Sequence, residues 1–321
     1  MCSNLTSCPT HDQLKLCYLG GVVRNNSFTF SAITLSTSAV LAVLSPIAVV
    51  GNISIMAVIW RNRTLRTPSY ILLSGLAFTD FCTGFITQPL FVASRFICFE
   101  PSQKPNARQL SFLPYAIAVS AGCSNYFHAL SLLLITLMSI ERWFHMTRRS
   151  LLTVRRSCFI VAAMLVLLMP IAAFRLTNIL KQIFDPVSIT VSFVILLFCI
   201  IATSIAYFKV FKIIRHHQQQ VTANESSENF GQPAINLAKY KKSVFTILYI
   251  LALLFATFLP LLVFVGISLF SYRSELDLIF QLALTLSYVS SSLSPLMYLW
   301  RMNDIRNGMK QLLNQLLCKD G

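Results

Sequence analysis

Long apolar runs alternate with short polar segments along this chain. Seven runs reach the roughly 20 apolar residues that a helix needs to cross a bilayer, and they lie near 31–60, 69–97, 111–141, 152–174, 187–213, 243–269 and 277–300. Each run is far longer than a membrane β-strand, and none alternates strictly between polar and apolar residues. The pattern therefore predicts an all-α fold, a seven-transmembrane helix bundle that occupies residues 31–301.

Polar segments flank the predicted bundle at both ends. Residues 1–30 form a tail without the basic start and apolar core of a cleavable signal peptide, so the first span is expected to act as its own signal. Residues 302–321 follow the last span and hold nearly all of the run "RMNDIRNGMKQLLNQLLC". This run predicts a short amphipathic eighth helix at the membrane surface, with Cys318 as a palmitoylation site.

Composition and charge place most of the chain in lipid and orient it. Hydrophobic residues make up 55% of the chain and charged residues 12%, and the mean hydropathy is +0.68, which is too apolar for a soluble domain. Most of the 26 Lys and Arg follow the odd-numbered spans, so the N-terminus is expected outside and the C-terminus in the cytoplasm. The net charge of +15 then suits anionic membrane lipids and an acidic partner, and no nucleic-acid motif is present.

The tail expected outside carries candidate modification sites. Asn4 and Asn25 begin N-glycosylation sequons. An oxidising compartment permits disulfides among the outer cysteines, and their pairing stays open; these are Cys2, Cys8, Cys17 and Cys98.

The chain lacks the residue sets that an enzyme or a transporter needs. Its five histidines are scattered, without a nucleophile and base or a metal constellation, so we expect no enzyme activity. A transporter would need paired charges at mid-membrane, and Asp80 is the one acid deep within a span.

Short motifs lie in order along the spans, and together they resemble the rhodopsin-like (class A) G-protein-coupled receptors. They are "VVGNISI" with Asn52, "LSGLAFTD" with Asp80, "SIERW" with Glu141, Arg142 and Trp143, "IAYFKVFK" with Tyr207, "FATFLP" with Phe258 and Pro260, and "SSLSPLMY" with Pro295 and Tyr298. The resemblance implies a plasma-membrane receptor that turns binding of an extracellular ligand into activation of a heterotrimeric G protein.

The resemblance also implies a switch at the cytoplasmic side. Glu141 would hold Arg142 in the resting state, and Tyr207 and Tyr298 would close around Arg142 on activation, so that a ligand shifts the populations of two states. Pro260 and Pro295 would act as hinges or as kinks that do not move, because each removes a helix hydrogen bond.

The buried acid Asp80 has two readings. In the family this position helps to bind a sodium ion, with Ser131 and Ser291 at matching sites. The alternative is a carboxyl kept neutral by hydrogen bonds to Asn52 and its neighbours. We favour the polar network, because Ser294 replaces the asparagine of the family. No other cofactor is expected.

The resemblance places a mainly apolar ligand cavity between the helices. Ser124 occupies the place where amine receptors carry an aspartate, and Tyr288 stands where an opsin holds its retinal lysine, so amine and retinal ligands are disfavoured. The cavity suits a lipid, a small neutral molecule or a peptide. Its expected lining is Gln88, Ser124, Asn125, His128, Phe258, Leu261, Leu262 and Tyr288.

Several departures from the family pattern leave a second reading open. Ile117 replaces the usual outer cysteine, and the second outer loop is short and has none, which resembles the melanocortin-like receptors. Trp143, Phe258 and Ser294 alter switch motifs, so a non-signalling decoy or scaffold with seven helices is the alternative to a signalling receptor.

Overall fold

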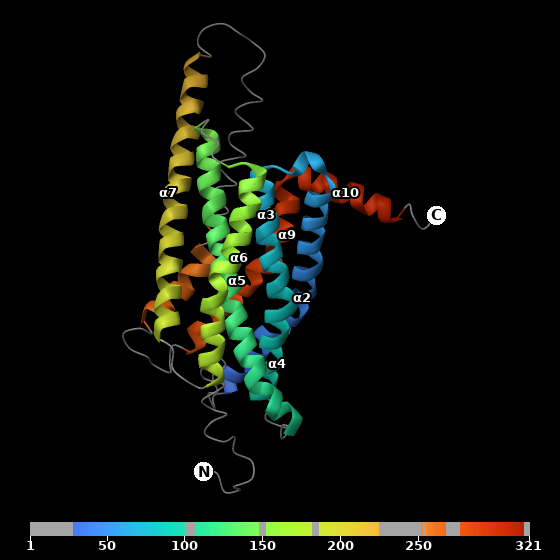
Figure 1. Ribbon diagram of the computed structural model, residues 1–321, viewed down its shortest axis with the longest axis vertical. Coiled ribbons are helices and arrows are strands. Elements are labelled where there is room, and N and C mark those ends of the chain that lie inside the picture. Colours follow the sequence, from blue (N-terminus) through green and yellow to red (C-terminus); the bar gives the residue numbers. More distant parts are fainter. Residues whose placement is uncertain are drawn as a thin grey trace.

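Long helices run side by side to form the molecule (Figure 1). The computed structural model describes residues 28–99, 107–147, 152–181, 186–224, 252, 255–267 and 277–317, and no strand occurs within these ranges. The labelled elements are α2 (Phe28–Arg61), η1 (Arg63–Leu65), α3 (Pro68–Cys82), η2 (Thr83–Thr87), α4 (Gln88–Phe99), α5 (Ala107–Met146), α6 (Val154–Leu180), α7 (Pro186–Asn224), α9 (Asp277–Arg301) and α10 (Asn303–Leu317).

The predicted all-α fold is confirmed. Six helical segments are long and apolar enough to cross a membrane, one of them the continuous stretch of α3, η2 and α4. The remaining predicted span, 243–269, is described only at residue 252 and as the helix Phe255–Ile267. The predicted amphipathic helix is present as α10, whereas Cys318, Asn4, Asn25 and the tail cysteines lie outside the described residues.

Two helices continue beyond the predicted span boundaries. α6 reaches Leu180 and α7 reaches Asn224, although the apolar runs end near 174 and 213. An apolar run marks the part of a helix that crosses lipid, and backbone hydrogen bonding extends a helix into water where the polar residues permit it.

The helix α5 lies at the centre of the packing, in contact with α3, α4, α6 and α7, while α2 packs against α3, α4 and α9. At one end of the bundle α10 turns aside, and α7 projects past its neighbours at the same end (Figure 1); we call this the α10 end. Large side chains of α6 face outward, including Phe159 and Leu167, 74% and 72% exposed. A helix surface of this kind is suited to lipid.

Two glycines bring α2 unusually close to its neighbours. A Cβ on Gly51 would lie 2.7 Å from Cγ of Pro295 in α9, and a Cβ on Gly84 would lie 2.7 Å from that of Ala48. Ser45 in α2 also donates a hydrogen bond to the Gly84 carbonyl at 2.7 Å, within the π-helical turn η2. Small residues permit such close helix contacts in membranes, and interhelical hydrogen bonds secure them.

Candidate functional site

The two charged residues of the motif at the end of α5, Glu141 and Arg142, have different neighbours. Glu141 is buried, and its carboxylate accepts a hydrogen bond from Ser69 in α3 at 2.6 Å. The described residues include no ion pair between Glu141 and Arg142, so the expected resting-state pairing is not formed in this conformation. Successive residues of a helix point in different directions, which lets α3 engage the acid without the arginine.

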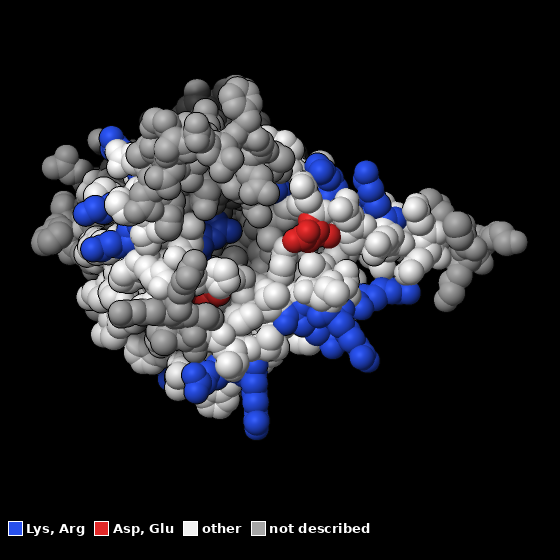
Figure 2. All heavy atoms as spheres, turned by 90° about the horizontal axis from the view of Figure 1, so that it is seen from above, with Lys and Arg blue, Asp and Glu red and all other residues white. Residues whose placement is uncertain are grey.

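Arg142, the next residue, is half-buried. It is close enough to interact electrostatically with Tyr70 and Arg301. The Tyr70 hydroxyl donates to Asp304 Oδ2 at 2.9 Å, which ties α3 to the first turn of α10. Basic residues gather around a hollow on this face of the molecule (Figure 2).

The motif tryptophan joins α5 to α7. Trp143 packs against the buried cluster of Tyr207, Val210 and Ile214. Tyr298 of α9 lies within electrostatic range of Tyr207. The two tyrosines named from the sequence therefore lie within electrostatic range of each other.

Aromatic contacts run through the middle of the bundle. Phe258 is buried in a cluster that also holds Leu262, and its ring meets the ring of His128 edge to face at 6.1 Å. Leu261 and Pro260 are half-buried. The hinge candidate Pro295 is buried at the close contact with α2 described above.

The carboxyl of Asp80 is buried, and its polar surroundings differ from those expected. Ser291 and Ser294 lie within its hydrogen-bonding environment. Ser131 instead shares a 2.8 Å hydrogen bond with Thr79. Among the described residues nothing pairs with Asp80 Oδ2.

The amide of Asn52 does not supply the expected partner for Asp80. Its Nδ2 donates to the carbonyls of Ala48 and Ser291, at 2.8 and 3.2 Å. Its Oδ1 is buried and has no partner in the described part of the chain. The network thus contains two buried oxygen atoms without a hydrogen-bond donor among the described residues, Asp80 Oδ2 and Asn52 Oδ1. Two such oxygens suit a small cation or a water molecule.

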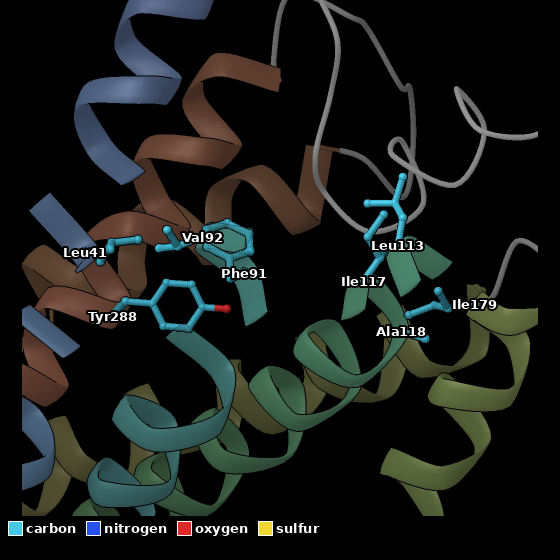
Figure 3. Packing of buried hydrophobic residues seen from close by; sticks show 8 residues of the cluster. All are labelled: Leu41, Phe91, Val92, Leu113, Ile117, Ala118, Ile179 and Tyr288. Atoms are coloured by element: carbon cyan, nitrogen blue, oxygen red, sulfur yellow. The ribbon is translucent and has the colours of Figure 1, made fainter. Parts of the chain in front are cut away.

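Three of the predicted ligand residues, Gln88, Ser124 and His128, contact Tyr288. The Tyr288 hydroxyl donates to Ser124 Oγ at 2.9 Å, and Ser124 shares a 3.2 Å hydrogen bond with His128 Nδ1. Gln88 Nε2 donates to the Tyr288 carbonyl at 3.0 Å. Figure 3 shows the Tyr288 and Phe91 rings side by side, with centroids 5.1 Å apart.

Asn125 has a partner in α7, whereas two atoms of the other predicted residues have none among the described residues. Asn125 accepts a hydrogen bond from Ser192 in α7 at 2.9 Å. Gln88 Oε1 and His128 Nε2 are buried without a partner among the described residues. The structure therefore brings together residues of α4, α5 and α9 with spare hydrogen-bonding capacity.

Sequence reasoning missed Arg95. No motif includes this residue, and its side chain is 1% exposed and lies inside the bundle. An arginine two residues before the end of an apolar span ordinarily extends to the membrane surface, so no pattern in the sequence indicated that it turns inward.

Comparisons with known proteins agree with this arrangement. The family model described as "7 transmembrane receptor (rhodopsin family)" matches residues 51–298. The human olfactory receptor 8D4 is 34% identical over 77 residues, 24% of this chain and 24% of its own length. Rat melanopsin is 29% identical over 115 residues, 36% of this chain and 22% of its own length.

The chain thus spans about a quarter of the length of these curated relatives. The family match is far broader, since it runs from the close α2–α9 contact at Gly51 to Tyr298 at the α10 end. The chain is a multi-pass membrane protein that belongs to the rhodopsin family of seven-transmembrane receptors.

Proposed function

We propose that this protein is a plasma-membrane receptor that converts binding of an extracellular ligand into activation of a heterotrimeric G protein. The observation that carries the proposal is the meeting of motif residues from α5, α7 and α9: Trp143, the neighbour of Arg142, packs against Tyr207, and Tyr298 lies within electrostatic range of Tyr207. Membership of a receptor family supports it. In this orientation the N-terminus lies outside and the α10 end, with its basic face (Figure 2), lies in the cytoplasm.

Contacts from Tyr288 to Phe258 give the signal a physical route into the middle of the bundle. A ligand near Tyr288 would contact the Ser124 and His128 hydrogen-bond chain, and His128 meets Phe258 between α5 and the Phe255–Ile267 helix. Ligand binding that favours one arrangement of these side chains shifts the population of the whole bundle. At the α10 end Glu141 is already engaged by Ser69, so Arg142 can meet a G protein without breaking a pair with its neighbour.

The proposal is tested by ligand-independent G-protein recruitment in living cells, across the G-protein families. Wild type is compared with Arg142→Glu at equal surface expression. A signal that the substitution removes supports a signalling receptor. A signal that persists unchanged contradicts the role of Arg142, and the decoy or scaffold alternative expects no recruitment by either form, even when ligand is present.

We also propose that the Asp80 network binds a sodium ion as an allosteric modulator. The support is the pair of unsatisfied buried acceptors, Asp80 Oδ2 and Asn52 Oδ1, because a buried acceptor without a partner is costly. When bound, the ion would supply positive charge to that pair; Asp80, Asn52 and Ser291 would hold it.

Replacing Asp80 with asparagine should abolish sodium-dependent stabilisation. The apparent melting temperature of the purified receptor is measured in sodium chloride and in choline chloride, and we expect sodium to raise it only when the carboxylate is present. Asp304→Asn, the same change at the α10 end, is the control and should retain the sodium response. A wild-type receptor that melts at one temperature in both salts rules out the sodium site.

A further inference from the structure

The buried guanidinium of Arg95 is an unusual feature of the half of the bundle opposite α10. Arg95 is among the largest side chains that are fully buried. Its Cζ lies 4.1 Å from the centroid of the Phe91 ring, so the guanidinium covers an aromatic face. Lysine and arginine at membrane edges usually extend toward water, so an inward position needs a reason.

Only part of this guanidinium is satisfied. Nη1 donates to Thr37 Oγ1 of α2 at 3.1 Å. Nε and Nη2 have no hydrogen-bond partner among the residues that the structure describes. A buried charge without a counter-ion is strongly unfavourable, and the Thr37 hydroxyl and Phe91 ring are both neutral.

A second unsatisfied donor belongs to the same polar cluster. Gln281 of α9 is 1% exposed, its Oε1 accepts from Thr34 at 2.7 Å, and its Nε2 has no partner in the described residues. Thr37 also donates to the Thr34 carbonyl at 3.0 Å. Thus α4, α2 and α9 are linked through Arg95, Thr37, Thr34 and Gln281, and the unused groups at both ends of this chain are donors.

Apolar side chains adjoin these donors. Phe91, beneath the guanidinium, belongs to a buried cluster with Leu41, Val92, Leu113, Ile117 and Tyr288 (Figure 3). Gln88 precedes Arg95 by two turns of the second span, about 10 Å. The unpaired Gln88 Oε1 and His128 Nε2 therefore lie at a second polar level, separated from the donors by apolar groups.

We propose that Arg95 and Gln281 bind the carboxylate of an amphiphilic organic acid whose apolar body lies along Phe91 and its cluster. A carboxylate offers only acceptors and matches the fork of donors on a guanidinium. It also neutralises the buried charge, which a neutral ligand cannot do. This inference rests on the proposed function in placing the ligand in this half of the bundle, and it replaces the broad choice of lipid, neutral molecule or peptide with an acid.

The test measures binding on the purified full-length receptor, without a G protein. The apparent melting temperature is recorded with octanoate and decanoate, with the matched alcohols octanol and decanol, and with acetate. We expect the two longer acids to raise the melting temperature and the alcohols and acetate to leave it unchanged. The proposal is overturned if neither octanoate nor decanoate raises the melting temperature, or if the matched alcohols raise it equally.

Two variants separate a ligand-binding role of Arg95 from a purely structural one. Arg95→Met should weaken binding of the acids at least tenfold and raise the melting temperature of the ligand-free receptor, because it removes a buried charge that has no counter-ion among the described residues. Thr37→Val removes the hydrogen bond to Nη1 and keeps the charge, so the acids should still bind. The proposal would be contradicted if the ligand-free Arg95→Met variant melted at a lower temperature than wild type. It would also be contradicted if the acids bound this variant as tightly as they bind wild type.

A further variant and a separate readout keep the result interpretable. If Arg95→Met fails to fold, Gln281→Leu is measured in its place and should weaken acid binding at least threefold; unchanged binding contradicts the site. Recruitment of a G protein is scored independently in cells. Acid binding that needs Arg95 but evokes no recruitment supports this site while contradicting the proposed function.

Discussion

Replacing Arg142 with glutamate is expected to reduce ligand-independent G-protein recruitment by more than about tenfold, the scale at which reversing a buried interfacial charge acts. Arg142 is half-buried beside Tyr70 and Arg301 and is not paired with Glu141. A glutamate beside Arg301 brings opposite charges together, so the variant should fold and reach the cell surface. Recruitment by a proximity assay, normalised to surface expression, measures the effect.

A matched charge reversal controls for the basic character of this face. Arg155 is exposed at the start of α6, and Arg155→Glu makes the same change in net charge away from Tyr207 and Tyr298. We expect this variant to keep most of the wild-type signal. An equal loss in both variants would assign the effect to the general charge of the face and would remove the specific role of Arg142.

Replacing Gly51 with alanine should lower the stability of the receptor more than the same substitution at Gly122. The new Cβ would lie 2.7 and 2.8 Å from two ring carbons of Pro295, and a proline ring within a helix cannot turn aside. Overpacking of this kind costs about 1–3 kcal/mol. The apparent melting temperature of the purified receptor, and the fraction that reaches the surface, report the loss.

The control for this prediction is Gly122→Ala in α5. A Cβ there meets Leu176 Cβ at 3.4 Å, an ordinary contact. Both substitutions gain about 1 kcal/mol of helix propensity over glycine, so their difference isolates the contact with Pro295. If Gly51→Ala were as stable as Gly122→Ala, the close α2–α9 approach would not be a constraint on the fold.

The sequence indicated some of the contacts between candidate functional residues but not the hydrogen-bond partner of each polar atom. Tyr207 and Tyr298 stand in motifs with family-like spacing, and in the structure they lie within electrostatic range of each other. Ser124, His128 and Tyr288 were expected to share a cavity, and they form one hydrogen-bond chain. The resemblance thus led to several residues that contact one another in the structure, while their functional roles stay predictions. It did not predict the partner of each polar atom, since Glu141 bonds to Ser69 and Asn52 bonds to backbone carbonyls.

The sequence by itself determined the helical class, the number of spans and the amphipathic α10, because lipid offers no hydrogen bonds and a long apolar run must satisfy its backbone within a helix. Only the tertiary structure decided which face of each helix is buried. Helices that are apolar all round carry no stripe to mark an inner side, so the choice depends on contacts between residues far apart in the chain. The inward guanidinium of Arg95, resting on Phe91 and bonded to Thr37, is the clearest result of that choice.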